Sequence, residues 1–527
     1  MQTTPQTAAP SRRSMDPEAV HHRRWLILGI LCLSLVLVVV ANTALNVALP
    51  TLVRELHATS TQLQWVTDAY ALVFAGLLLP AGALGDRFGR KGALQFGLSV
   101  VGISALLSTF ATSADQLIAF RALMGLGAAF VMPATLSILA NVFPPQERAR
   151  AIAIWAGFAG AAGAIGPVVS GLLLEHFRWN SVFFVNVPIV IVALLAGYLF
   201  VPTSSDPSHG KLDPLGAALS MVGLGALLYA IIQAPVNGWG SVSTIAAFVV
   251  SALAITAFIL WELNTATPML PMEFFKNRRF SIGSATITLT FFTMFGLFFI
   301  LTLYLQFVLG YSPVIAGVST FPLGVMMIIF APRSAGFVVK WGQHRVQAVG
   351  LTLVAVGLLV LSLLTPTSNY LIVAVGLALM GIGVACTTAP ATNAIIGSVP
   401  LSKSGVGSAV NDTTREVGGA LGIAVLGSVM SSAFRSSMVD KVTNLPANLA
   451  PIAQDSVGGS FEVAKGLGEG GQALRDTASL AFTDAMHTTL YMGAGVALLA
   501  AAMVYFLFPR GEAPAWGGGH DAVAADD

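Results

Sequence analysis

The chain has 527 residues, of which 55% are hydrophobic and only 9% are charged. Soluble domains carry about 25% charged residues, so this composition excludes an ordinary soluble protein and predicts an integral membrane protein. The formal net charge is only +2, and the basic residues are spread over short loops, so we expect no nucleic-acid partner. Cys32 and Cys386 both lie in apolar runs and are expected to be buried residues without a disulfide.

Hydropathy predicts fourteen membrane-spanning helices. The first, at about 25–49, follows a polar tail and is too long to be the core of a signal peptide. The last two, at about 406–430 and 485–508, are separated by a Gly-, Ala- and Ser-rich segment at about 431–484, which we expect to be a long extracellular loop. Basic residues fall in every second loop, which by the positive-inside rule places both termini in the cytoplasm.

A charged turn follows the second predicted span. It combines glycines, one acid and three bases: Gly82, Asp86, Arg87, Gly89, Arg90 and Lys91. With Leu84 these residues fill every position of Gly-x-Leu-x-Asp-Arg-x-Gly-Arg-Lys/Arg, and the turn resembles the loop between the second and third helices of the major facilitator superfamily. A degraded copy follows the tenth predicted span at 336–345, where Lys340 occupies the acidic position. We interpret Asp86 with Arg90 as a conformational latch between helices.

The resemblance implies an all-α integral membrane fold of two six-helix halves, with the substrate site between them near the midplane. Fourteen spans then leave two inserted helices, at about 215–234 and 244–262. The implied domains are a cytoplasmic tail at 1–24, an amino-terminal half at 25–201, a linker at 202–280, a carboxyl-terminal half at 281–509, and a disordered cytoplasmic tail at 510–527.

Five ionisable residues inside predicted spans are our candidates for a functional role, because charge is costly there and usually functional. They are Asp68, Arg121, Asp412, Arg415 and Glu416. Asp412 and Glu416 are four residues apart and therefore share one helix face, while Arg415 is placed to neutralise Asp412. We expect one acid to pair with Arg415 and the other, by preference Glu416, to take up a proton. The structural alternatives are a helix-start aspartate at Asp68, an arginine reaching the outer interface at Arg121, and a purely structural ion pair at Arg415.

The fifth predicted span is rich in glycine. Small residues at three- and four-residue spacing let helices approach closely, and a proline bends the helix. The segment Gly166-Pro167-x-x-Ser170-Gly171, preceded by Gly163, resembles the antiporter motif Gly-Pro-x-x-Gly-Gly of exporters in that superfamily, with Ser170 in place of one glycine. Close helix packing alone is the alternative explanation.

Over about residues 25–510 the chain resembles the fourteen-helix drug:proton antiporters of the EmrB/QacA kind. Two further segments carry the resemblance, at 46–50 and 178–188. It implies export of lipophilic, cationic compounds by alternating access, with Arg121 taking part in proton transfer. One departure concerns Ala41, two residues before Thr43, where many relatives have an aspartate.

Polar and aromatic residues near these positions are candidates for the substrate cavity, because aromatic faces bind cations. They are Asn46, Trp65, Tyr70, Phe291, Tyr304 and Asn411. The chain has neither a nucleotide-binding glycine loop nor metal-ligand spacing, so we expect no cofactor or metal, no enzymatic activity, and a proton gradient as the energy source. We expect a monomer in the lipid of a bacterial cell membrane. An exporter of one endogenous metabolite, antibiotic or lipid is the main alternative, and a membrane receptor or intramembrane enzyme is less favoured.

Overall fold

The computed structural model describes residues 17–45, 48, 52, 55–56, 60–205, 213–468 and 471–510. All regular secondary structure in these residues is helical, and 14 of the described helices are long and apolar enough to cross a membrane. This confirms the predicted all-α class and the number of spans. Asn46, residues 206–212 of the predicted linker, and the predicted tails at 1–16 and 511–527 lie outside the described residues.

The amino-terminal half contains six spans. They are α1 (Pro17–Thr43), α3 (Ser60–Phe88), α4 (Arg90–Thr109), α5 (Ala114–Val142), α6 (Pro145–His176), and α7 (Ser181–Phe184) together with α8 (Asn186–Phe200). The turn between α3 and α4 depends on Gly89, whose φ of 116° suits glycine and strains other residues. Ser113 caps α5 by accepting a hydrogen bond from the backbone N–H of Gln116.

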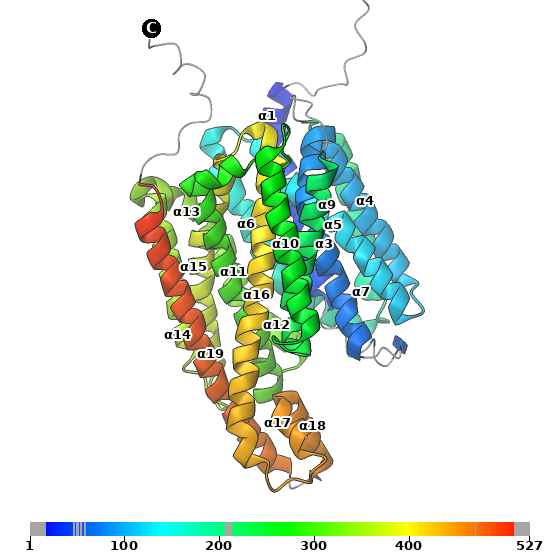
Figure 1. Cartoon of the computed structure of the whole chain (residues 1–527), viewed down its shortest axis with the longest axis vertical. Helices are drawn as coiled ribbons and strands as arrows, with labels where there is room; N and C mark the ends of the chain where they lie inside the picture. Colours follow the sequence, from blue (N-terminus) through cyan, green and yellow to red (C-terminus); the bar gives the residue numbers. More distant parts are fainter. Residues whose placement is uncertain are drawn as a thin grey trace, which may run out of the picture.

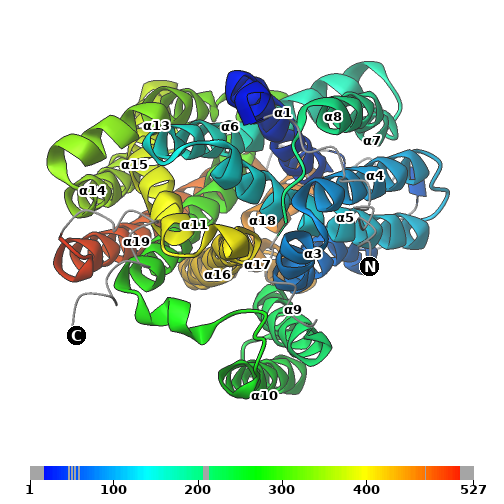
Figure 2. The same cartoon turned by 90° about the horizontal axis from the view of Figure 1, so that it is seen from above.

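Two inserted helices follow, α9 (Pro214–Asn237) and α10 (Val242–Asn264), which match the two predicted inserted spans. Asp213 and Ser241 cap their amino-terminal ends with side-chain hydrogen bonds. Figure 2 shows this pair at the edge of the bundle, where α9 packs against α3 and α16 while α10 lies further out. The outer helix exposes many large apolar side chains, as expected for a lipid-facing surface.

The carboxyl-terminal half also has six spans. They are α11 (Arg278–Leu303) with the π-helical turn Tyr304–Val308, α12 (Pro313–Val318) with α13 (Phe321–Trp341), α14 (Gln343–Leu361), α15 (Tyr370–Gly397), α16 (Ser404–Met438) and α19 (Gly471–Leu507). Separate buried clusters of apolar side chains form the cores of the two halves. Cys32 and Cys386 are free and buried, as predicted.

The prediction of a long loop at 431–484 is wrong. Helix α16 continues to Met438 and α19 already begins at Gly471, and α17 (Ala450–Asp455) and α18 (Val457–Gly466) lie between them. These segments extend beyond the bundle, at the end opposite to the start of α1 and the end of α19 (Figure 1). The physical reason is that the segment packs into the core of the carboxyl-terminal half, with Phe434, Met438 and Phe482 each at most 2% exposed.

The halves meet mainly where α3 packs on α16 and α6 packs on α13 (Figure 2). Glycines permit both approaches. A Cβ atom on Gly82 would lie 2.5 Å from the carbonyl oxygen of Gly405, and one on Gly157 would lie 3.4 Å from that of Met327. Close backbone packing of this kind is typical of membrane helices, whose association depends on van der Waals contact.

Candidate functional site

Helix α16 carries a cluster of four polar residues, Asn411, Asp412, Arg415 and Glu416, which we call the α16 cluster. Asp412 is 1% exposed, and its Oδ1 accepts a 3.3 Å hydrogen bond from Asn411 Nδ2. Its Oδ2 has no hydrogen-bond partner among the described residues. Asn411 is also held from α15, because Thr392 Oγ1 donates a 2.9 Å bond to Asn411 Oδ1. Glu416 remains partly exposed, so the two acids differ in access.

The expected ion pair of Arg415 with one of these acids does not form. Within the described residues, no nitrogen of Arg415 lies within ion-pair distance of either carboxylate. Its guanidinium carbon lies 5.0 Å from the ring centroids of both Trp155 and Phe291. A planar guanidinium stacks well on aromatic faces, and that contact replaces the predicted pair here. Sequence reasoning did not identify Trp155 as part of this site. Its Nε1 donates a 3.3 Å bond to Thr135 Oγ1.

Arg121 is fully buried between helices, and so it does not reach the outer interface. Its Nε donates to the carbonyl oxygen of Val66 at 3.1 Å, and its Nη1 donates to that of Ala41 at 3.2 Å. The guanidinium carbon lies 4.4 Å from the centroid of the Tyr70 ring. Arg121 therefore joins α5 to α1 and α3 within the amino-terminal half.

Asp68 and Trp65 face the inserted helix α9. Asp68 is 8% exposed, and its Oδ2 accepts a 3.4 Å hydrogen bond from Gln233 Nε2. The Trp65 ring stacks on Tyr229 with centroids 6.3 Å apart. The inserted helix thus contributes polar and aromatic side chains next to a buried acid, which sequence reasoning missed. The available signal was Gln233 itself, an amide within an apolar span.

Other predicted residues do not join these groups. Tyr304 is fully buried inside the carboxyl-terminal half, where its hydroxyl donates a 2.7 Å bond to the carbonyl oxygen of Thr365. A Cβ atom on Gly163 would meet nothing within 4 Å. By contrast, a Cβ on Gly166 would collide with Thr43 of α1, and one on Gly171 with Val314 of α12. Pro167 lies within α6, and its side chain is outside the described part of the structure.

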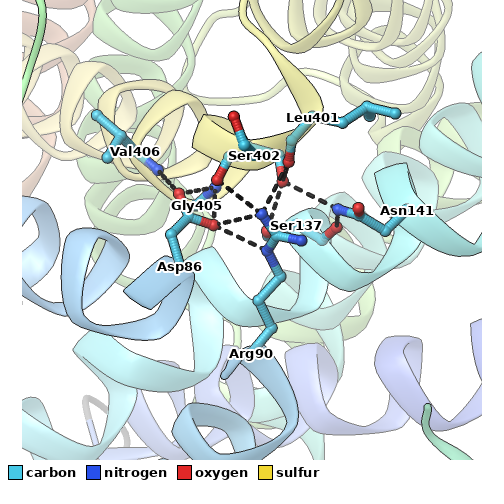
Figure 3. A network of polar contacts seen from close by, with 9 residues as sticks. Asp86, Arg90, Ser137, Asn141, Leu401, Ser402, Gly405 and Val406 are labelled. Atoms are coloured by element: carbon cyan, nitrogen blue, oxygen red, sulfur yellow. Dashed lines mark hydrogen bonds and ion pairs between the residues drawn. The ribbon is translucent and has the colours of Figure 1, made fainter. Parts of the chain in front are cut away.

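The charged turn after α3 forms a polar network with the start of α16, which we call the α3–α16 lock (Figure 3). Asp86 is 2% exposed and accepts hydrogen bonds from the backbone N–H groups of Gly405 at 2.8 Å and Val406 at 3.1 Å. The first N–H groups of a helix have no partner inside it, and Lys403 at the N-cap supplies none. Asp86 therefore caps a helix of the opposite half.

Arg90 completes the lock. Its Nε donates a 2.8 Å bond to Asp86 Oδ1, and its Nη2 donates to the carbonyl oxygens of Leu401 at 2.8 Å and Ser402 at 2.9 Å. Arg90 is only 1% exposed, so these bonds satisfy a buried charge. Figure 3 also shows Ser137 and Asn141 of α5 beside this network.

Ser137 and Asn141 add neutral contacts from α5 to the start of α16. The hydroxyl groups of Ser137 and Ser404 are 2.8 Å apart, and Asn141 Nδ2 donates a 3.0 Å bond to Ser404 Oγ. The remaining bases of the turn have other contacts, since Lys91 Nζ donates to the carbonyl oxygen of Tyr198 and Arg87 lies over the Phe88 ring. The lock therefore joins the halves through Asp86, Arg90 and α5.

No group of three or more potential metal ligands occurs among the described residues. The arrangement is one of two helical halves, buried ionisable groups at their boundary, and a polar lock at one end. Together these features define a multi-pass membrane transporter. Residues 31–423 match the family described as the Major Facilitator Superfamily, so the chain belongs to that family.

Similar proteins of comparable length include three bacterial transporters. The multidrug efflux pump LfrA of Mycolicibacterium smegmatis is 35% identical over 494 residues, which cover 93% of this chain and 97% of that protein. The methyl viologen resistance protein SmvA of Salmonella typhimurium is 34% identical, covering 93% and 99%. The tetracenomycin C resistance and export protein of Streptomyces glaucescens is 32% identical, covering 93% and 94%.

Two solved structures share the fold at low sequence identity. The human organic anion transporter MFSD10 superposes with a TM-score of 0.59 at 14% identity, covering 91% of this chain and 99% of that one. The proton:xylose symporter XylE superposes with a TM-score of 0.58 at 12% identity, covering 93% and 96%. At these identities the likeness concerns the fold alone.

Proposed function

We propose that the chain exports lipophilic, mostly cationic drugs or toxic compounds in exchange for protons. The observation that carries this proposal is the α16 cluster, where Asp412 and Glu416 lie one turn apart at the boundary between the halves. Acids buried in a membrane protein mark proton or ion pathways by default. Their position at the boundary exposes them to opposite sides of the membrane as the halves rock.

Protons drive export through linkage. An acid that binds its proton more tightly in the outward-open state than in the inward-open state transfers it inward with each cycle. Protonation from outside favours substrate release, and deprotonation inside favours substrate binding. Asp68 and Arg121 assist by holding charge near the same boundary. No cofactor takes part in this cycle.

The α3–α16 lock stabilises one of the two end states. It joins the halves at the end of the bundle where α3 finishes and α16 begins, which we assign to the cytoplasmic side. Fourteen spans return the chain to its starting side, so both termini are cytoplasmic and the protrusion of α17 and α18 is extracellular. We place the protein as a monomer in the inner membrane of a bacterium, surrounded by lipid and with no nucleic-acid partner.

The names of the relatives support export as the direction of transport. LfrA and SmvA are named for multidrug efflux and for methyl viologen resistance. The glycine-rich α6 is consistent with this direction, since Gly166 and Gly171 let α6 approach α1 and α12 closely. Aromatic rings at the boundary, including Tyr70, Trp155 and Phe291, suit flat lipophilic cations.

A second candidate is export of a single antibiotic or metabolite by the same mechanism. It is favoured by relatives named for resistance to one compound each, namely tetracenomycin C, methylenomycin A and puromycin. Transport by the wild type across a panel of chemically unrelated compounds separates the two candidates. A narrow profile supports the second and leaves the proton-coupled mechanism intact.

The test is transport of ethidium by purified protein in liposomes under an imposed pH gradient. We expect transport to collapse with an uncoupler, and to be lost in Asp412→Asn or Glu416→Gln. Asp68→Asn should weaken transport less. Glu175→Gln, at an exposed acid near the end of α6, is the matched control and should transport normally. Full transport in all three variants would refute the role of these acids.

A further inference from the structure

Arg415 lies between two aromatic rings that belong to opposite halves. Its guanidinium carbon is 5.0 Å from the centroids of both Trp155 on α6 and Phe291 on α11. The Trp155 ring is fully buried and oriented by its hydrogen bond to Thr135. Two rings that face one cation at equal distance form a binding position for positive charge, because the face of each ring carries negative potential. Here the position is filled by a side chain of the protein itself.

Arg415 forms no ion pair with the two carboxylates that are nearest to it in the sequence. Asp412 and Glu416 lie on the same helix, within one turn, yet no ion pair joins either of them to Arg415 in the described part of the chain. Arg415 Nε and Asp412 Oδ2 are both buried without hydrogen-bond partners there. In a low-dielectric interior, ionised carboxylates would attract the guanidinium strongly. The observed arrangement fits acids that carry their protons, since a neutral carboxyl group attracts a guanidinium much less than a carboxylate does.

Arg415 therefore has two alternative partners within reach of one side chain. It lies on the rings when the acids are neutral, and it can pair with Asp412 at i,i+3 spacing when they are ionised. We propose that Arg415 is a tethered competitor for the cation position between Trp155 and Phe291, so that a substrate cation and a proton exclude each other through its movement. This inference rests on the proposed antiport function and names its specificity-determining residues.

The exchange balances in charge. When Asp412 or Glu416 loses its proton to the water on the open side, Arg415 moves to the carboxylate and the rings accept one monovalent cation. When the acid is protonated again, Arg415 returns to the rings and displaces that cation. One proton is replaced by one monovalent cation, so the charge of the buried boundary is unchanged. A low-dielectric site favours such exchange over any step that adds net charge.

Among the groups around the α16 cluster, Arg415 is the cation that can move. Arg121 is held in place by carbonyl oxygens of α1 and α3. The contact between α16 and α19 through Met430 and Thr489 lies about four turns further along α16. The other groups in contact with the cluster are Trp155 of α6, Phe291 of α11 and Thr392 of α15, none of which carries a charge.

The experiment measures ethidium binding to full-length protein in lipid nanodiscs between pH 5.5 and 8.5, with proton release followed by a dye in weak buffer. In the wild type, affinity should rise with pH and about one proton should be released per ethidium bound, as linkage requires. In Arg415→Gln, binding should be tighter and nearly independent of pH, with little proton release. An uncharged compound of similar ring size should release no proton from the wild type.

Ring variants test the position itself. Trp155→Leu and Phe291→Leu should each weaken ethidium binding by about thirtyfold, the size expected for a desolvated cation–π contact of about 2 kcal/mol. The matched control is Phe299→Leu, at an exposed ring two turns further along α11, which should bind as the wild type does. Thermal unfolding checks that each variant is folded. Should Arg415→Gln fail to fold, Arg415→Lys retains the charge and lacks the planar group, and it should show tighter binding with reduced proton release.

The outcomes separate the inference from the function on which it rests. If the wild type exports ethidium but Arg415→Gln keeps the wild-type pH dependence and proton release, the tethered competitor is refuted and antiport stands. Unchanged binding in both ring variants refutes it as well. If the wild type neither binds nor exports any cation, the proposed function itself fails.

Discussion

The turn after α3 and its degraded copy after α13 occupy corresponding places in the two halves, and only the first forms a lock. In the first, Asp86 and Arg90 are at most 2% exposed and hold the start of α16. In the copy, Lys340 stands at the acidic position, is exposed, and lies over the ring of its neighbour Trp341. Both turns retain a glycine with positive φ, at Gly89 and Gly342. The copy therefore keeps the backbone conformation of the turn but lacks its acidic residue.

The helix that each turn faces explains the difference. In the first turn of helix α16, the N–H groups of Gly405 and Val406 donate to Asp86. Its counterpart α6 begins with Pro145, and the N–H group of Glu147 in its first turn already donates to the carbonyl oxygen of Pro144 at 3.0 Å. A carboxylate in the copy would therefore find fewer donors. One strong lock at this end leaves the two contacts between the halves unequal, so we expect them to separate first where α6 meets α13.

Removal of the Asp86 carboxylate should have the largest effect on this comparison. In Asp86→Ala, Arg90 stays buried without its acid, and breaking a buried pair in this way costs about 3–5 kcal/mol. We expect loss of ethidium transport, together with exposure of the end of α5. A cysteine at Ser137→Cys reports that exposure through labelling by a membrane-impermeant maleimide, against a low background because Cys32 and Cys386 are buried.

Asp86→Asn is the graded comparison for this variant. The amide oxygen still accepts from Gly405 and Val406, but the charge that pairs with Arg90 is gone. Transport should fall less than in Asp86→Ala, and labelling at Ser137→Cys should be intermediate. Equal labelling in both variants and in the wild type would mean that the lock does not control access.

Adding one methyl group to each turn compares the two turns without changing any charge. In Gly82→Ala, the new Cβ would lie 2.5 Å from the carbonyl oxygen of Gly405 and 2.8 Å from Ala409 Cβ, so the halves must move apart. In Gly336→Ala, the Cβ meets nothing within 4 Å. We expect Gly82→Ala to reduce transport severalfold and Gly336→Ala to leave it unchanged, with transport rates in liposomes as the measurement. Similar rates for the two variants would contradict the close approach at Gly82.

The sequence predicted the spans well because membrane helices carry long apolar runs. It also singled out Asp86 and Arg90, because they stand in a dense local pattern, and their role as a conformational latch stays a prediction. It did not predict the partners of Arg415, because Trp155 and Phe291 belong to other helices, and helix periodicity identifies a face without showing what lies opposite. The helical protrusion was missed for a related reason, since its apolar side chains are buried only when segments distant in sequence pack together.

The smallest effect is expected from restoring an acid in the copy. Lys340→Asp returns the acidic residue to the position that corresponds to Asp86, and a lock that depended on this residue alone would then form at α6. We expect transport to change by less than about twofold, as is usual for an exposed surface substitution. The reason is that the N–H group of Glu147 in the first turn of α6 already bonds the carbonyl oxygen of Pro144, and that its carboxylate pairs with Arg24 at 2.7 Å. Strongly slowed transport, with stronger protection of Ser137→Cys from the maleimide, would instead indicate a second lock. In that case the acid itself, and not the helix it faces, would set the difference between the two turns.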